Sequence, residues 1–166
     1  MASKPTAIAI QTFKVPPQRV YDAILSPEMI GRFMFGPLLR EETILHIRND
    51  LRVGGEFSYK VRRGEHEIDH VGKFLELSPP VALSSENATT MESRTPLGRP
   101  GRIAFTWAVA GESDGGDPSI VTIDITPTSD GCSVRLMHEM PPEWADFIDR
   151  SRGAWEKMLS VLATLL

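Results

Sequence analysis

The sequence is poor in cysteine, and this scarcity limits how the fold can be held together. Cys132 is the single cysteine, so no disulfide can form within the chain. A chain without disulfides is typical of a reducing compartment, and we expect a cytoplasmic protein. The length of 166 residues is enough for a proper hydrophobic core, and we expect residues 1–166 to form a single domain.

The chain also lacks a basic excess and long hydrophobic runs. Its formal net charge is −4, which offers no basic face for nucleic acid and no attraction to an anionic membrane. No run approaches the ~20 apolar residues of a membrane span, and the first residues lack the apolar core of a signal peptide. Phosphate-binding loops, nucleophile elbows and dinucleotide fingerprints are missing too. We therefore expect a soluble protein that binds neither nucleic acid nor membrane.

What the sequence does contain is one long amphipathic stretch at its C-terminal end. At about 100° per residue, a helix from Trp144 to Leu166 gathers the large apolar side chains on one stripe. The stripe consists of Trp144, Phe147, Ile148, Trp155, Met158, Leu159, Leu162, Leu165 and Leu166. Ser151 interrupts it, with Arg152 at its edge. Either the helix tolerates one small polar residue there, or it faces a cavity at that point.

The N-terminal part predicts one strand followed by two short helices. Ala7–Val15 is rich in small and β-branched residues and is stopped by Pro16-Pro17. A first helix is expected from Pro17 to Leu25. Ser26-Pro27-Glu28 then supplies an N-cap serine, a first-turn proline and a first-turn acid for a second helix.

From Glu41 onward the hydrophobic period is two, which predicts a meander of antiparallel strands. The expected strands are Thr43–Leu51, Glu56–Val61, Ile68–Leu77, Val81–Ser85, Arg102–Val109, Ser119–Pro127 and Cys132–Glu139. Gly72 predicts a bulge or bend. Ser84–Gly101 shows no periodicity, and we expect it to form a mobile flap near the open end of the sheet. A meander covered by one long helix is an α+β design.

Short motifs along the chain resemble those of one superfamily. In order, they are Val15–Ala23 with Ser26-Pro27-Glu28, Leu51–Phe57, Gly72 with Glu76 and Pro79-Pro80, Phe105-Thr106-Trp107, His138-Glu139 and Ala154-Trp155. They are similar to the SRPBCC (START/Bet v 1-like) superfamily, in the branch named for the C-terminal domain of the Hsp90 ATPase activator Aha1. The resemblance implies a helix-grip fold, in which a curved antiparallel sheet wraps around the C-terminal helix and leaves a cavity. The Ser84–Gly101 insert and Ala154, where relatives often have glycine, depart from the family pattern.

The inward faces of these elements converge on a candidate site for a small ligand. Its residues are Phe57, Tyr59, Phe105, Trp107, His138, Ser151, Trp155 and Met158. Tightly packed, they would be an ordinary core. With space between them, they would line an aromatic pocket whose few polar groups are His138 and Tyr59, a composition typical of small-molecule sites. His138 or Tyr59 would then be the weak candidates for catalytic proton transfer, since Glu139 points to the other side of its strand.

The other reactive side chains predict no metal or cofactor site. His66 and His70 are four residues apart, but on a strand this separates them by roughly 13 Å, too far to share one zinc ion. Cys132 has no base beside it and is expected in the core.

Three functions are compatible with these observations. The first is the binding of a small apolar or aromatic molecule between sheet and helix. The second, implied by the resemblance, is a polyketide cyclase- or hydrolase-like enzyme that uses the same pocket. The third is a module that interacts with an Hsp90-type chaperone. An enzyme needs two or more converging polar groups, a binding protein needs one or none, and a chaperone partner needs an exposed surface. A homodimer is compatible with each.

Overall fold

The chain forms the α+β arrangement that its pattern predicts. The computed structural model describes residues 5–82, 98–111 and 118–166. The N-terminal elements are β1 (Thr6–Phe13), α1 (Pro17–Leu25) and α2 (Pro27–Phe33). The strands that follow are β2 (Thr43–Asn49), β3 (Glu56–Arg63), β4 (His66–Ser78), β5 (Val81–Ala82), β6 (Gly98–Arg99), β7 (Gly101–Val109), β8 (Ser119–Thr128) and β9 (Gly131–Glu139). A 3₁₀ helix, η1 (Pro142–Phe147), leads into the last helix, α4 (Ile148–Leu165).

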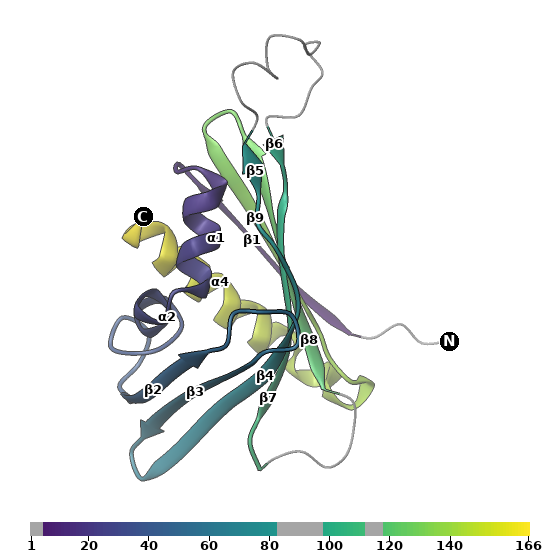
Figure 1. Ribbon diagram of the computed structural model, residues 1–166. Coiled ribbons are helices and arrows are strands. Elements are labelled where there is room, and N and C mark those ends of the chain that lie inside the picture. The colour runs from purple at the N-terminus through teal and green to yellow at the C-terminus, as the bar shows by residue number, and fades with distance from the viewer. Residues whose placement is uncertain (1–4, 83–97, 112–117) are drawn as a thin grey trace, which may run out of the picture.

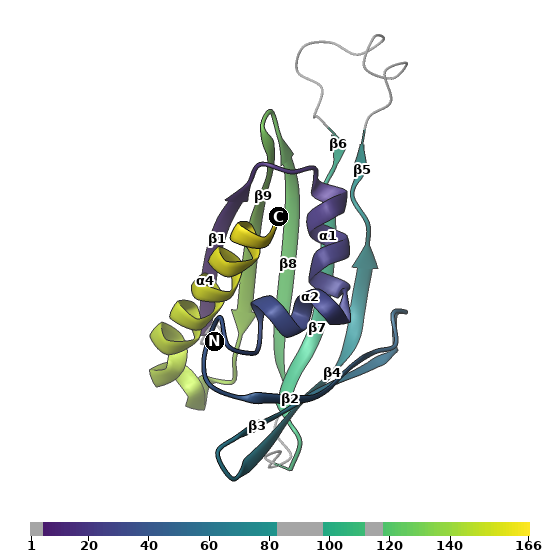
Figure 2. The ribbon, with the colours of Figure 1, turned by 90° about the vertical axis from the view of Figure 1, so that its left-hand side faces the viewer.

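Seven of the strands form one antiparallel sheet, in the order β1-β9-β8-β7-β4-β3-β2. The sheet is strongly curved, and the helices lie on its concave side (Figure 1). Helix α4 packs against β1, while α1 and α2 cover β7 and β8 and the β2 edge (Figure 2). This is the helix-grip arrangement that the resemblance implied. None of the helices in the described part of the chain is long and apolar enough to span a membrane.

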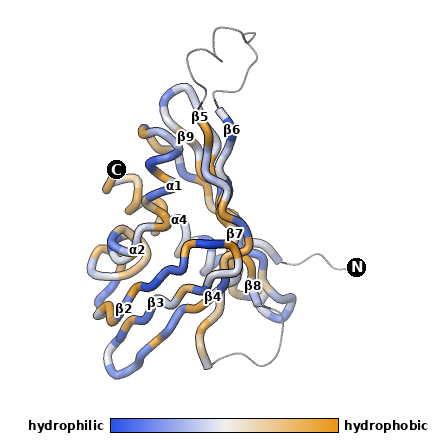
Figure 3. The backbone as a smooth tube through the Cα atoms, in the orientation of Figure 1, coloured by the Kyte–Doolittle hydropathy of each residue, from blue (hydrophilic) through white to orange (hydrophobic). Residues whose placement is uncertain are grey.

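The strands bury one face, as their alternation predicts, and hydrophobic and hydrophilic residues alternate along them (Figure 3). Val121, Ile123 and Ile125 of β8 are all buried. In β4 the bulge lies between Phe74 and Glu76, where the register with β7 shifts, a few residues beyond the position that the sequence indicated.

The N-terminal helices also follow the sequence signals. The side chain of Ser26 accepts a hydrogen bond from the backbone N–H of Met29 at 3.4 Å, so it caps α2 as predicted. Ile30 and Phe33 then face the core. The two helices thereby cover the middle of the sheet that α4 leaves open.

The prediction of one apolar stripe along the C-terminal helix is wrong at the N-terminal end of that helix. The α-helix starts at Ile148, and the preceding residues form the 3₁₀ helix η1. A 3₁₀ helix has about 3.0 residues per turn, so Trp144 and Phe147 stay on one face, but this face is offset from the apolar face of the α-helix that follows. Trp144 and Phe147 are accordingly 49% and 46% exposed, and their ring centroids lie 5.7 Å apart on the surface.

The predicted strand Val81–Ser85 is described only as β5, which pairs with β6. Gly98–Arg99 is thus regular structure at the end of the stretch that showed no periodicity. The rest of the expected flap, residues 83–97, lies outside the described residues.

Candidate functional site

The concave face carries a continuous wall of aromatic rings, which we call the aromatic wall: Phe57, Tyr59, Phe105, Trp107 and Trp155. Centroid distances are 4.6 Å between Phe57 and Tyr59 and 5.4 Å between Phe57 and Phe105. The wall continues through Trp107, whose ring centroid lies 6.0 Å from that of Phe105 and 5.6 Å from that of Trp155. Four of the rings are buried and Trp107 is partly exposed. The accessible edge of the wall is therefore at Trp107.

Gly72 makes the middle of this wall possible. It lies opposite Phe57 in the register of β3 and β4. A Cβ atom at this position would collide with the carbonyl oxygen of Thr106 and with the ring of Phe57. The absent side chain lets the Phe57 ring lie flat over the strand and reach Trp107, at a centroid distance of 5.9 Å.

His138 connects the last helix to the sheet through a directional chain of hydrogen bonds. The Trp155 indole N–H donates to Nδ1 of His138 at 3.1 Å, so this nitrogen must be unprotonated. Ser151 Oγ lies 3.0 Å from the same nitrogen. Nε2 therefore carries the proton and donates to Ser119 Oγ at 2.9 Å, and Ser119 donates to the backbone oxygen of Trp107 at 2.7 Å. Both ring nitrogens of His138 are occupied.

Burial lowers the pKa of His138 to about 4. The imidazole is thus neutral at neutral pH, and protonation of Nδ1 would place its proton against the Trp155 donor. A residue with no free nitrogen is poorly placed to carry protons to a substrate. The network indicates that His138 holds helix and sheet together.

Tyr59, the other weak candidate for proton transfer, is equally engaged. Its hydroxyl donates to Asn49 Oδ1 at 2.5 Å, and Asn49 Nδ2 donates to the carbonyl oxygen of Leu25 at 2.8 Å. Burial raises the pKa of the Tyr59 hydroxyl, and the hydrogen bond to Asn49 offsets only part of that rise. The pair ties the end of α1 to the sheet.

His70 is a buried polar residue beside the aromatic wall, and the sequence singled it out only as a possible metal partner of His66. It is 8% exposed and lies directly opposite Tyr59 on β3. Its Nδ1 lies 3.1 Å from the Tyr59 carbonyl oxygen, which can only accept, so Nδ1 carries the proton. Its ring packs 4.9 Å from Phe35 and 5.3 Å from Trp107, measured between centroids. Burial lowers the pKa of His70, which keeps Nε2 a neutral acceptor.

A buried carboxylate lies near His70. Glu42, whose side chain is fully buried, accepts from Arg63 Nε at 2.7 Å, from Arg40 Nη1 at 2.9 Å and from the Gly36 N–H at 2.7 Å. Burial alone would raise the pKa of Glu42, but these hydrogen bonds and the charge of Arg40 outweigh it and lower the pKa. The cluster fixes the loop after α2 against β3.

The space between sheet and helices is small where the described residues enclose it. A cavity of about 20 Å³ lies there, lined by apolar side chains that include Leu25, Met34, Phe105 and Trp155. This volume suffices for about one water molecule, whereas a ligand pocket needs roughly 300 Å³ or more. The idea of a gap under Ser151 is wrong, because its hydroxyl reaches His138 on the sheet. A small polar residue is needed there to meet the imidazole.

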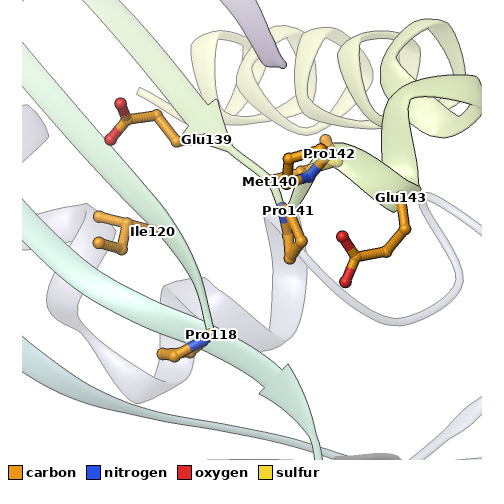
Figure 4. Close-up of a pocket in the computed structure, with 7 residues that line it drawn as sticks. All are labelled: Pro118, Ile120, Glu139, Met140, Pro141, Pro142 and Glu143. Carbon is orange, nitrogen blue, oxygen red and sulfur yellow. The ribbon is translucent and has the colours of Figure 1, made fainter. Parts of the chain in front are cut away.

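The described residues also line two hollows that contain no ring of the aromatic wall. One, of about 110 Å³, is lined by residues that include Pro118, Ile120 and Pro141, with the carboxylates of Glu139 and Glu143 at its sides (Figure 4). The other is an open groove of about 540 Å³ beside Pro16, Pro80 and Pro127, among other residues. Neither contains a residue that the sequence selected for a site.

The remaining residues considered from the sequence differ in their burial. Met158 is buried in the core. His66 is exposed and His70 buried, and no group of three or more potential metal ligands occurs among the described residues. Cys132 is fully buried, and burial raises the pKa of its thiol to about 11. A thiol with such a pKa is a packing group rather than a nucleophile.

A polar row that the sequence did not reveal crosses β2, β3 and β4. Ser58 donates to Asp69 at 2.6 Å, so it accepts from His46 Nε2 at 2.7 Å. The three residue types are those of a hydrolase triad, but serine stands between the other two, so the carboxylate does not orient the histidine and the histidine donates to the serine instead of accepting its proton. The row is a cross-strand contact that stabilises the sheet.

Comparisons with known proteins agree with this geometry. None of the proteins with curated descriptions matches the sequence. Among solved structures, protein CV1439 from Chromobacterium violaceum superposes with a TM-score of 0.67 at 23% identity, covering 97% of this chain and 96% of that one. Protein NE0264 from Nitrosomonas europaea gives a TM-score of 0.69 at 19% identity, covering 100% and 96%. Identities this low show a shared fold alone.

The family comparison is more specific. The profile of the Activator of Hsp90 ATPase homolog 1-like proteins matches residues 14–166, from the end of β1 to the end of the chain. Because the match spans nearly every element described above, the chain belongs to this family, a branch of the SRPBCC superfamily with the helix-grip fold.

Proposed function

We propose that this protein binds a small apolar or aromatic molecule between the sheet and α4, against the aromatic wall. The observation that carries the proposal is the wall itself, which runs from the buried Phe57 to the partly exposed Trp107. Four of its rings are buried and Trp107 gives access to them, and small-molecule sites are lined mainly by apolar and aromatic side chains. The residues proposed to contact the ligand remain those selected from the sequence, with His70 added.

The hydrogen bonding of the polar groups supports a binding function better than a catalytic one. His138 and Tyr59 are saturated by internal partners and stay neutral near pH 7. A cyclase- or hydrolase-like reaction needs polar groups free to exchange protons with the substrate. The hydrogen bonds of both residues instead fix the shape of the site.

A ligand can enter this space only if part of the helical layer moves away from the sheet. The enclosed volume of about 20 Å³ cannot hold an aromatic molecule, so part of its lining must move. Met34 and Phe33 line the cavity from α2 and its end. A short helix held mainly by side-chain packing can shift outward at lower cost than the hydrogen-bonded strands on the other side.

The proposal is tested by titrating the protein with 2-methoxynaphthalene and measuring binding by calorimetry. We expect binding by the parent protein and at least tenfold weaker binding by Trp107→Ala, because the accessible edge of the wall is lost. Trp144→Ala is the matched control, since Trp144 is an exposed tryptophan on η1, and it should bind like the parent. Absence of binding up to the solubility limit of the probe, or equal losses in both variants, would refute the proposal.

A second candidate is contact with an Hsp90-type chaperone. The specific observation in its favour is the exposed pair Trp144 and Phe147, since exposed aromatic side chains are enriched at protein interfaces. Stimulation of Hsp90 ATPase activity that is lost in Trp144→Ala would support it. Unchanged ATPase activity with the parent protein would exclude this role.

A further inference from the structure

Two side-chain nitrogens at the accessible edge of the aromatic wall have no hydrogen-bond partner among the described residues. They are Nε2 of His70 and Nε1 of Trp107. Every buried side-chain nitrogen or oxygen in the described part of the chain has a partner, so these two atoms reach the surface. The other polar groups around the wall are paired with one another. Polar specificity at this site therefore rests on His70 and Trp107.

The two nitrogens have opposite hydrogen-bonding roles. Nδ1 of His70 donates to the Tyr59 carbonyl oxygen, so in the neutral ring Nε2 has a lone pair and accepts. The indole N–H of Trp107 can only donate. The two ring centroids are 5.3 Å apart. A hydroxyl group both donates and accepts, so it is the smallest neutral group that satisfies both nitrogens.

The rings and charges around His70 restrict the chemical class of the ligand further. His70 packs against Phe35 and Trp107, which suits a flat aromatic body. Arg40 and Arg63 act on His70 together with the single carboxylate of Glu42, and both guanidinium groups are paired with that carboxylate. These two arginines and one glutamate leave one net positive charge near His70. This charge disfavours a ligand that donates from an ammonium group and tolerates a ligand with an acidic hydroxyl group.

We infer that the ligand is an aromatic molecule with a hydroxyl group, and that this group donates to Nε2 of His70 and accepts from Nε1 of Trp107. The inference rests on the proposed binding function and names the chemical class that the site selects. His70 is the specificity-determining residue, because an aromatic ether or hydrocarbon of the same size leaves its acceptor unpaired. One such hydrogen bond is worth roughly tenfold in affinity.

The test compares 2-naphthol with 2-methoxynaphthalene, which has the same ring but cannot donate. The full chain should bind 2-naphthol about tenfold more tightly. His70→Phe keeps a ring and removes the acceptor, so it should lose this preference and bind 2-methoxynaphthalene within about twofold of the parent. His66→Phe, an exposed histidine of the same strand, is the control and should retain the preference.

A nitrogen-15 NMR titration of the parent protein keeps the test independent of how the variant folds. The Nε2 resonance of His70 should start at the position of an unprotonated nitrogen and move with 2-naphthol but not with 2-methoxynaphthalene. Equal affinities for both probes, a preference that persists in His70→Phe, or a His70 resonance that ignores 2-naphthol would overturn this inference and leave the binding function standing. Failure of both probes to bind would overturn the binding function and this inference with it.

Discussion

At the scale of single residues, His138 links the stability of the fold to pH. Its neutral ring accepts from Trp155 and donates to Ser119, so one tautomer is fixed on both sides. Burial removes the solvent that would stabilise the charged form. The same contacts that make His138 a poor proton carrier make its protonation costly.

We therefore expect the protein to lose stability in mild acid. The pKa of His138 is about 4 in the folded protein and near ~6.5 in an unfolded chain. Between these values the unfolded chain binds a proton that the folded one excludes. The free energy of unfolding should then be unaffected by this group above pH ~6.5 and fall by roughly 3 kcal/mol as pH drops to ~4.

Urea denaturation at a series of pH values measures this loss. His138→Gln should flatten the profile between pH ~6.5 and ~4. His66→Gln, at an exposed position of β4, should leave it unchanged. A His138→Gln profile as steep as that of the parent would show that another group is responsible.

Glu42 is the second residue whose environment makes a strong prediction. Its carboxylate accepts from two arginines and a backbone N–H, and glutamine would remove the charge and replace one accepting oxygen with an NH₂ donor. Glu42→Gln should lower the free energy of unfolding by roughly 2–4 kcal/mol. The neighbouring Glu41 is exposed, and Glu41→Gln should be nearly neutral in the same denaturation experiment. Similar stabilities of the two variants would contradict this role of Glu42.

At the scale of elements, helix α4 is attached to the sheet by side-chain packing and by hydrogen bonds. Its buried residues are Trp155, Met158, Leu159 and Leu162, from the middle of the helix onward. Ser151 in its first half and Trp155 near its middle bind His138 through hydrogen bonds. Trp155 thus contributes both to the packing of the helix and to its polar contacts.

Truncation of Leu162 should accordingly be costly. Leu162 is fully buried, and Leu162→Ala should destabilise the protein by roughly 2–5 kcal/mol in urea denaturation. Ser160→Ala on the exposed side of the helix should change stability by less than about 0.5 kcal/mol. Phe147→Ala, although on the apolar stripe of the sequence, should be nearly as mild, since the ring is 46% exposed. A large loss at Phe147 would mean that the stripe extends further than the structure shows.

The same helix shows what the sequence could and could not predict. The period of 3.6 residues placed Trp155, Leu159 and Leu162 correctly because each contacts the sheet within a regular α-helix. It misplaced Trp144 because periodicity carries no information about a switch to 3₁₀ geometry. Ser151 was noticed as an irregularity, but its reason lies on another element, in His138, and no local pattern reveals such a partner.

At the scale of the whole molecule, the element order could be predicted because turn residues and alternation are local signals, whereas the curved sheet was implied by the family resemblance. The residues that lie opposite one another on neighbouring strands around the candidate site could not be predicted in this way. His70 lies beside the aromatic wall because it pairs with Tyr59 across β3 and β4, and the sequence does not determine this register. The cavity volume depends on how tightly α1 and α2 close over the sheet, which is a property of the assembled fold.

The three tryptophans of the chain are suitable probes of the function proposed for the molecule. Trp107 and Trp155 belong to the aromatic wall, with centroids 5.6 Å apart, and Trp144 lies on the surface of η1. The three indole N–H groups give separate signals in a two-dimensional proton–nitrogen NMR spectrum. They can be assigned by replacing each tryptophan with phenylalanine.

The most direct measurement is therefore an NMR titration of the protein with 2-naphthol that follows these three signals. The signals of Trp107 and Trp155 should move together and saturate at one dissociation constant, while that of Trp144 stays in place. Movement of the Trp144 signal alone, or of none of the three at saturating probe, would contradict a ligand site between the sheet and the last helix.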